Sequence, residues 1–363
     1  MKRNRTRTRR LSVAAVAAAL VVTGWVAAPV QAEVNDTGAV SGTVFGRAIG
    51  STAETVPGVP VTVLQLDEDS GTFEPVPGAT DVTDGDGDYL IDGLPEGDYR
   101  LCFGSPGQIV ASRWISSCYR NAYSVDQARD IEVGPGEVNS LQLSESLLPA
   151  FTDVALPLSV EQESLDGRAA VGGHPFWSEI TDLALFGVTT GYDEADGSRT
   201  FRPGQPVLRE QMAAFLYRTE KLETGMEPEV DLPEVSPFTD VPTTHVFYRE
   251  IVWLADRRIT TGYFDGTFRP GQPVLREQMA AFLYRFDGSE FEDGDGADDV
   301  GPEFTDVNSA NNVFFDEIEW MALEGITTGY DEGNGTRTFR PAQPVLREQM
   351  AAFLIRFAEP LIN

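Results

Sequence analysis

The stretch PVLREQMAAFL at residues 206–216 returns unchanged at residues 273–283 and again at residues 344–354. In every copy the methionine is followed three and four residues later by phenylalanine and leucine. That spacing places the three apolar side chains on one face of a helix. The sequence therefore predicts a fold in which three copies of one amphipathic helix bury the same face.

Each copy closes a longer repeat. The repeats open with Phe-Thr-Asp-Val at Phe151, Phe238 and Phe304, and continue with a shorter helical pattern, Thr-Thr-Gly-Tyr and Phe-Arg-Pro. The first repeat is stretched relative to the second. A unit of two short helices cannot bury both apolar faces alone, so we expect the three repeats to pack on one another.

The remaining chain divides around these repeats. Two connecting segments are rich in Glu, Asp, Pro or Gly, as is typical of solvated tethers. We predict a signal peptide at residues 1–32, a β-sandwich at 33–147, the first repeat at 148–218, an acidic linker at 219–237, the second repeat at 238–286, an acidic linker at 287–303 and the third repeat at 304–363.

Charge and the first residues predict the location. The 363 residues carry a formal net charge of −30, which repels nucleic acid and anionic lipid, so neither is an expected partner. A basic start, an apolar segment at Leu11–Val22 and the small residues of Val30-Gln31-Ala32 predict a cleaved signal peptide. The pair Arg9-Arg10 leaves general and twin-arginine export both open. We expect a secreted protein with no membrane span in the mature chain, because no later segment has the roughly 18 apolar residues that one needs.

Residues 33–147 read as all-β. Short segments rich in Val, Thr, Tyr and Phe alternate with Gly, Pro and Asp turns. The expected strands are Ala39–Ala48, Val61–Leu66, Tyr99–Phe103 and Ile131–Leu143. The chain has two cysteines, Cys102 and Cys118, both in this region, and outside the cytoplasm we expect them to form a disulfide.

A turn in this region could bind calcium. Asp84, Asp86 and Asp88 alternate with glycines, which could bring three carboxylates to one ion. Asp-Gly is also a common hairpin signal, and Pro95 stands where an EF-hand loop would need glutamate. We favour the hairpin turn and expect no cofactor.

The two histidines belong to the repeats. His174 and His245 each precede a helix as His-x-Phe, and the third repeat has Asn312 at that position. A catalytic or zinc-binding histidine is not readily replaced by an amide, so we predict a hydrogen bond at the start of each helix.

Each copy of the opening stretch has an arginine at a position where a basic residue is unusual. Arg209, Arg276 and Arg347 lie in the first turn of their helices, where the helix dipole favours acids. A guanidinium beside free N–H groups would bind a carboxylate or another anion. The alternative is an internal ion pair with the aspartates of Phe-Thr-Asp-Val, and both interpretations stay open. Those aspartates are Asp153, Asp240 and Asp306.

The repeats resemble a known family. Phe-Thr-Asp-Val, the first helix, Thr-Thr-Gly-Tyr, Phe-Arg-Pro and LREQMAAFL are together similar to three S-layer homology modules. The preceding stretches PGVPVTVLQLD and TDGDGDYLIDGLPEGDYRLCF resemble carboxypeptidase regulatory-like or Cna B-type domains. The resemblance implies a multidomain chain: an all-β, transthyretin-like sandwich followed by an all-α, pseudo-threefold domain.

The same resemblance implies a function. S-layer homology modules bind secondary cell-wall polymers, often pyruvylated glycans, in grooves between modules. Their Thr-Arg-Ala-Glu motif falls on Leu208–Gln211, Leu275–Gln278 and Leu346–Gln349, with the arginine kept, threonine replaced by leucine and glutamate by glutamine. We expect the glycan-binding set to comprise the three arginines, the three aspartates and the turn glycines Gly191, Gly262 and Gly329.

The predicted protein is therefore non-catalytic. It would be held on the bacterial cell wall by an anionic, pyruvylated polymer and would display the sandwich. The alternatives are a calcium-dependent adhesin and a wall-associated glycoside hydrolase with two carboxylates.

Overall fold

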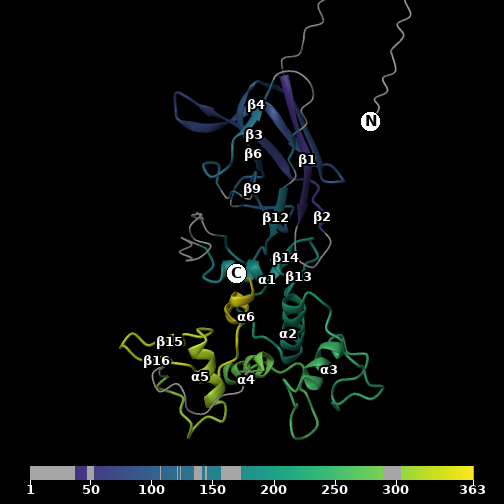
Figure 1. Cartoon of the computed structure of the whole chain (residues 1–363), viewed down its shortest axis with the longest axis vertical. Helices are drawn as coiled ribbons and strands as arrows, with labels where there is room; N and C mark the ends of the chain where they lie inside the picture. The colour runs from purple at the N-terminus through teal and green to yellow at the C-terminus, as the bar shows by residue number, and fades with distance from the viewer. Residues whose placement is uncertain are drawn as a thin grey trace, which may run out of the picture. The chain divides into compact units, whose positions relative to one another are not determined.

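The computed structural model of the chain describes residues 37–46, 53–106, 108–120, 122, 124–134, 141–143, 145–156, 173–288 and 304–362. The predicted signal peptide at 1–32 and nearly all of the predicted linker at 287–303 lie outside these residues. The long strands belong to the part of the chain drawn in purple and blue, and the helices to the part drawn in teal, green and yellow (Figure 1).

One sheet is built around the ten-residue strand β1 (Thr37–Gly46). Its other strands are β2 (Glu54–Thr55), β5 (Asp88–Pro95), β7 (Ile109–Val110), β8 (Trp114–Ile115), β11 (Leu141–Gln142) and β12 (Glu145–Pro149). The order is β11–β1–β12–β8–β7, and β2 and β5 also pair with β1. Both β11 and β12 run parallel to β1.

The second sheet has the order β10–β6–β3–β4, with β9 paired to β6. Its strands are β3 (Pro60–Asp67), β4 (Thr72–Val82), β6 (Gly97–Phe103), β9 (Ser117–Cys118) and β10 (Ile131–Val133). β-Branched residues fill the inward positions of β3, where Val61 and Val63 are buried. They share one hydrophobic core with Val44 of the first sheet and Leu101 of the second.

The predicted strands differ from the observed ones at one end of this region. The first three predicted strands correspond to β1, β3 and β6, but residues 131–143 hold two separate strands, β10 and β11. The sheet also continues past the predicted boundary at residue 147, because Leu148 and Pro149 of β12 pair with β8. Strands β4 and β5 were not predicted, since their polar and proline residues hide the alternation.

In the described residues after the sheets there are six helices, two in each repeat. They are α1 (Trp177–Leu185), α2 (Arg209–Thr224), α3 (Tyr248–Asp256), α4 (Arg276–Asp287), α5 (Phe315–Leu323) and α6 (Arg347–Ile362). The residue before α2, Leu208, is extended, and its N–H donates to Oε1 of Gln211 at 3.2 Å. The helix ends at Gly225, whose φ of 67° is the left-handed conformation that glycine adopts freely.

The second helices of the three repeats are joined through the segments that precede them. Val207 N–H donates to Val345 O, Val345 N–H to Val274 O and Val274 N–H to Val207 O, each at 2.9 Å. These bonds form a closed ring of one residue from each repeat. One continuous hydrophobic core runs through all three repeats, so they pack on one another as the repeat pattern predicts.

Two predictions about this part are corrected. The segment 219–237 is not simply a solvated tether, because α2 continues to Thr224 and the Oη atoms of Tyr217 and Tyr248 donate to the carbonyls of Pro228 and Pro233. The repeats are also not purely helical. The first contains the antiparallel pair β13 (Tyr192–Asp193) and β14 (Arg199–Thr200), and the third contains β15 (Tyr330–Asp331) and β16 (Arg337–Thr338).

Candidate functional site

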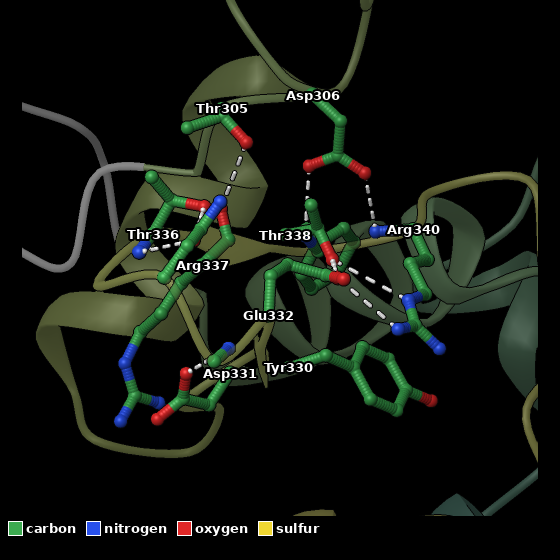
Figure 2. Close-up of polar contacts among 12 residues, drawn as sticks. Thr305, Asp306, Tyr330, Asp331, Glu332, Thr336, Arg337, Thr338 and Arg340 are labelled. Carbon is green, nitrogen blue, oxygen red and sulfur yellow. Dashed lines mark hydrogen bonds and ion pairs between the residues drawn. The ribbon is translucent and has the colours of Figure 1, made fainter.

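The aspartate of Phe-Thr-Asp-Val holds the Phe-Arg-Pro turn. In the third repeat, Asp306 accepts the N–H groups of Phe339 at 2.8 Å and Arg340 at 2.7 Å through its two carboxylate oxygens (Figure 2). Arg340 has a φ of 61°, an unfavourable value for a residue with a side chain. The carboxylate therefore stabilises a strained turn, and Asp153 and Asp240 make the same pair of bonds in the other repeats.

The turn glycine is required by packing. Gly329 has a φ of 64°, and a Cβ built on it would lie 2.3 Å from Cε1 of Phe304 and 2.7 Å from the carbonyl oxygen of Thr338. Gly191 and Gly262 face the equivalent phenylalanine and carbonyl at nearly the same distances. The glycine lets the Thr-Thr-Gly-Tyr turn lie directly on the phenylalanine that opens its repeat.

The arginine of each second helix is buried and reaches into the next repeat. Arg209, Arg276 and Arg347 are 5%, 3% and 3% exposed. Their Nε atoms donate to the carbonyl oxygens of Phe268, Phe339 and Phe201 at 2.7, 2.6 and 2.6 Å. The first repeat therefore contacts the second, the second contacts the third and the third contacts the first.

Aromatic rings surround each of these guanidiniums. The Cζ atom of Arg276 lies 4.8 Å from the ring centre of Tyr330, 4.7 Å from that of Phe339 and 5.3 Å from that of Phe353. The guanidinium of Arg340 lies over the same tyrosine ring, with its Cζ atom 4.0 Å from the ring centre. Each ring face attracts a cation, so the rings partly offset the loss of water around the buried charge.

No carboxylate forms a close ion pair with this guanidinium in the part of the chain that the structure describes. Asp306 spends both oxygens on backbone N–H groups, and Arg276 has no ion pair within 4.0 Å among the described residues. Burial lowers the pKa of Arg276; Tyr330 and Asp306 raise it and Arg340 lowers it further. The same causes, in the same order, act on Arg209 and Arg347. The internal ion pair considered from the sequence is therefore wrong.

The helix-start N–H groups are not free either. Arg276 N–H donates to Gln343 O at 2.9 Å, and Glu277 N–H donates to Pro341 O at 3.1 Å, both in the next repeat. The other two helices make the equivalent bonds. An anion beside the arginine would therefore meet the guanidinium, and not the first backbone donors of the helix.

Two of the arginines line cavities. One cavity, of about 130 Å³, is lined by Arg276 of the second repeat, Phe176 of the first, and residues 327–330 and α6 of the third. The other, of about 110 Å³, is lined by Arg347 of the third repeat, Phe247 of the second, and residues 189–192 and α2 of the first. Each cavity therefore draws on all three repeats.

The cavities bring together part of the predicted set. Arg276 shares a cavity with Gly329, and Arg347 shares one with Gly191. The aspartates do not line either cavity. The Cζ atom of Arg209 lies 4.9 Å from the ring centre of Tyr263, the residue after Gly262. This arginine of the first repeat therefore lies beside the turn of the second, as the other two arginines lie beside the turns of their next repeats.

A second arginine in each cavity was not predicted. Arg356 and Arg218 line the two cavities and donate to the carbonyls of Ile326 and Val188 in their own repeats at 3.3 and 3.2 Å. Both lie nine residues after the buried arginine of their helix, and Arg285 has that place in the second repeat. The recurrence of arginine at this spacing was the available signal.

Glutamine takes a distinct role at the end of the Leu-Arg-Glu-Gln stretch. Gln349 accepts the N–H of Leu346 at 3.3 Å and donates from Nε2 to the Oη of Tyr330 at 2.8 Å. Gln211 makes the same two bonds with Leu208 and Tyr192. A glutamate at this position could only accept from the tyrosine hydroxyl, whereas the amide donates to it and leaves its O–H free to donate elsewhere.

The predicted helix-start bonds of the histidines are confirmed. His174 and His245 accept the N–H groups of Phe176 and Phe247 at Nδ1, each at 3.2 Å. Asn312 accepts the N–H of Phe314 at Oδ1 at 2.8 Å. The three side chains therefore serve the same structural role.

The two candidates in the sheet region also have clear outcomes. Cys102 and Cys118 form a disulfide between the paired strands β6 and β9. Oδ1 of Asp84 accepts the N–H groups of Asp86 and Asp88, as in a hairpin turn. No group of three metal-binding side chains occurs among the residues that the structure describes.

No helix within the described ranges is both long and apolar enough to span a membrane.

Parts of this chain are similar in sequence to known proteins. A family model for the S-layer homology domain matches residues 237–280 and 303–351. Cell surface glycoprotein 1 of Acetivibrio thermocellus is 27% identical over 169 residues, which are 45% of this chain and 7% of that protein. The cellulosome-anchoring protein of the same organism is 25% identical over 161 residues, 44% of this chain and 33% of that protein. An endoglucanase of a Bacillus species is 33% identical over 127 residues, 35% of this chain and 12% of the enzyme.

The chain thus covers at most a third of the length of these relatives. Among solved structures, the minor pilin of Streptococcus agalactiae aligns with 32% of this chain and 46% of its own at 16% identity, with a TM-score of 0.21. The shaft pilin of Lactobacillus rhamnosus aligns with 33% of this chain and 53% of its own at 13% identity, also with a TM-score of 0.21. Residues 237–280 and 303–351 thus match the S-layer homology domain, and these similarities support a location at the cell surface or in the cell wall.

Proposed function

We propose that residues 148–363 form a pseudo-threefold domain of three S-layer homology modules, which holds the protein non-covalently on the bacterial cell wall. The ligand is a secondary cell-wall polymer with acidic, pyruvylated sugars, and the exported protein displays a transthyretin-like sandwich formed by the preceding residues. Residues 237–280 and 303–351 support two modules, and the first repeat shares with them the aspartate, glycine and arginine contacts described above.

The observation that carries the proposal is the unneutralised buried guanidinium at each cavity. A buried charge is costly unless it is paired, and an ion pair with Asp is absent among the described residues around Arg276 and Arg347. A carboxylate on the ligand would supply the missing partner. Arg356 or Arg218 adds a second positive charge to the lining of the cavity.

The size of the cavities favours a substituent over a whole sugar chain. Volumes of about 130 and 110 Å³ compare with the roughly 150 Å³ in which an engineered protein cavity holds benzene. A pyruvyl ketal, a small carboxylate group fixed to a sugar ring, fits this range. The exposed hydroxyls of Thr190 and Thr328 lie at the cavities and could bind the sugar to which the group is attached.

The cavities offer no acid for hydrolysis. Neither is lined by Asp or Glu, so neither contains the carboxylate pair of a glycoside hydrolase.

Binding to matched polymers tests the proposal. Calorimetry of the mature chain with purified polymer, before and after chemical removal of pyruvate, should give binding only before removal. Equal binding to both polymers would reject the carboxylate as the recognised group.

The variants must separate binding from stability. Replacing all three buried arginines by alanine should abolish binding, but it also removes a hydrogen bond between each pair of repeats and should lower the melting temperature. Arg218→Gln with Arg356→Gln leaves those bonds intact and should weaken binding by about tenfold or more. Arg258→Gln is the control, because Arg258 is exposed and lies outside both cavities.

A further inference from the structure

The histidine at the start of α1 contacts two elements at once. Its Nδ1 atom accepts the N–H of Phe176 at 3.2 Å, and its Nε2 atom lies 3.2 Å from Oε2 of Glu348 in α6. His245 does the same with Phe247 and with Glu210 of α2, at 3.2 and 3.3 Å. Each imidazole therefore links the start of one repeat to the second helix of another.

These contacts define the protonation of the ring. A backbone N–H can only donate, so Nδ1 must carry no proton, and Nε2 must then carry the proton that reaches the glutamate. The neutral ring with hydrogen on Nε2 satisfies both partners. Protonation would place a second N–H on Nδ1, directly opposite the N–H of the phenylalanine.

The third repeat makes the same two contacts without a titrating group. Asn312 accepts the N–H of Phe314 at Oδ1 and donates from Nδ2 to Oε2 of Glu277, both at 2.8 Å. The amide is thus a permanent equivalent of the neutral histidine. Histidine changes charge between about pH 5 and 8, whereas asparagine does not.

The phenylalanine held in this way is part of the candidate site. Phe176 lines the cavity that contains Arg276, and Phe247 lines the cavity that contains Arg347. The partner glutamates lie on the helices of the same cavities, Glu348 on α6 and Glu210 on α2. The imidazole therefore holds the backbone of a residue that lines the cavity.

Protonation strengthens one contact of the ring and removes the other. The contact with glutamate exists in both forms, because Nε2 donates in both, and acid only adds charge to it. The bond at Nδ1 is lost and becomes a contact between two donors near a helix N-terminus, where positive charge is disfavoured. In the described residues, glutamate is the charged side chain in contact with each ring, and Phe176 or Phe247 is its aromatic neighbour.

We propose that His174 and His245 are positioning residues that make the two described cavities acid-sensitive, while Asn312 makes the equivalent position of the third repeat insensitive to acid. In the neutral form the histidine fixes the phenylalanine wall, and in acid the wall is released and the ligand is held less tightly. The effect on ligand binding rests on the proposed function. The release of the backbone N–H does not.

Amide exchange tests the release without any ligand. Residue-resolved hydrogen exchange of the mature protein at about pH 7.5 and about pH 5.5, corrected for intrinsic rates, should show protection of Phe176 and Phe247 falling about tenfold in acid. The N–H of Phe314 in the same sample is the internal control and should keep its protection. Equal behaviour of all three would overturn the proposal.

Exchanging the residue types tests the regulation. His174→Asn with His245→Asn should bind pyruvylated polymer as the original chain does at about pH 7.5 and should retain that affinity at about pH 5.5. Asn312→His should make the third site acid-sensitive as well. Loss of polymer affinity in acid to the same extent in all three proteins would overturn the proposal.

The two proposals fail separately. If no pyruvylated polymer binds at any pH, the proposed function is wrong, but the exchange of Phe176 and Phe247 still decides whether the histidines act as described. If polymer binds and exchange does not change with pH, the function stands and the histidines are only structural.

Discussion

Arg276 shows how one side chain can serve both the fold and a site. Its Nε bonds to a carbonyl of the third repeat, its plane lies beside three rings, and it lines a cavity. Asp306 and Gly329, grouped with it from the sequence, have different roles. The aspartate fixes a strained turn, and the glycine allows two segments to touch.

The turn glycine gives a sharp prediction. In Gly191→Ala, the new Cβ would lie 2.4 Å from Cε1 of Phe151 in a residue with a φ of 68°. We expect the free energy of unfolding to fall by more than about 2 kcal/mol, because the clash and the backbone strain add. Chemical denaturation measures it.

Gly204→Ala is the matched control in the same repeat. No atom lies within 4 Å of its added Cβ, so its stability should change by less than about 0.5 kcal/mol. Similar losses for the two variants would contradict the close packing described at Gly191.

The sequence could identify the arginines but not their surroundings. An arginine in the first turn of three helices is unusual enough to be noticed in one sequence. Whether Asp306 would pair with it depends on a turn that brings Phe339 and Arg340 to that carboxylate, and those residues are more than thirty positions away. Contacts of this range leave no local pattern.

The helices and strands differ in how clearly the sequence predicts them. All six helices were predicted, because apolar residues at helical spacing recur in each repeat. Strands β4 and β5 were missed, because β4 carries Pro75 and Pro77 and because the apolar Leu90 of β5 is exposed, which breaks the apolar/polar alternation of that strand. The bonds of Arg276 and Glu277 to the next repeat were also missed, since they exist only once the ring is closed.

Glu223, near the end of α2, predicts that the stability of the protein depends on pH. Partial desolvation, followed by the carboxylates of Glu220 and Asp287, raises the pKa of Glu223 in α2 from 4.5 to about 7. An acid whose pKa is raised by folding stabilises the protein when protonated. That stabilisation is complete below pH 4.5 and is lost as the pH rises through about 7.

Glu223→Gln should therefore be more stable than the original chain at about pH 8 and equally stable at about pH 4. The gain should be modest, because Glu223 is exposed enough for solvent to screen its neighbours. Melting temperatures across this range measure it. Glu229→Gln removes the same charge from an exposed site and controls for net charge; an identical gain there would contradict the local explanation.

At the scale of the molecule, the repeats depend on one another in a closed order. Contacts between repeats are made by the three buried arginines, by the valines of the ring, and by the glutamate contacts of His174, His245 and Asn312. Closure removes the exposed end that an open row of repeats would have. Repeat proteins without such closure can unfold from their ends.

A chain ending at Gly288 tests this dependence. It would lack the third repeat and hence the partners of Arg276 and His174, namely Phe339 and Glu348. We expect the helical signal to melt at a lower temperature and over a broader range than in the full chain, because two of three junctions are lost. A sharp transition at the original temperature would show that two repeats form an independent unit.

The shared cavities have a mechanical consequence. A ligand seated beside Arg276 would also touch Phe176 and Thr328, and these three residues come from three different repeats. A force that separates one repeat from the other two would also have to break the ligand's contacts with that repeat. Occupancy would therefore raise the force needed to unravel the domain, by the linkage that couples binding to stability. When flowing fluid pulls on a cell, the same force would act on the ligand contacts and on the contacts between repeats. The domain would therefore resist unfolding best where polymer is abundant enough to fill its cavities.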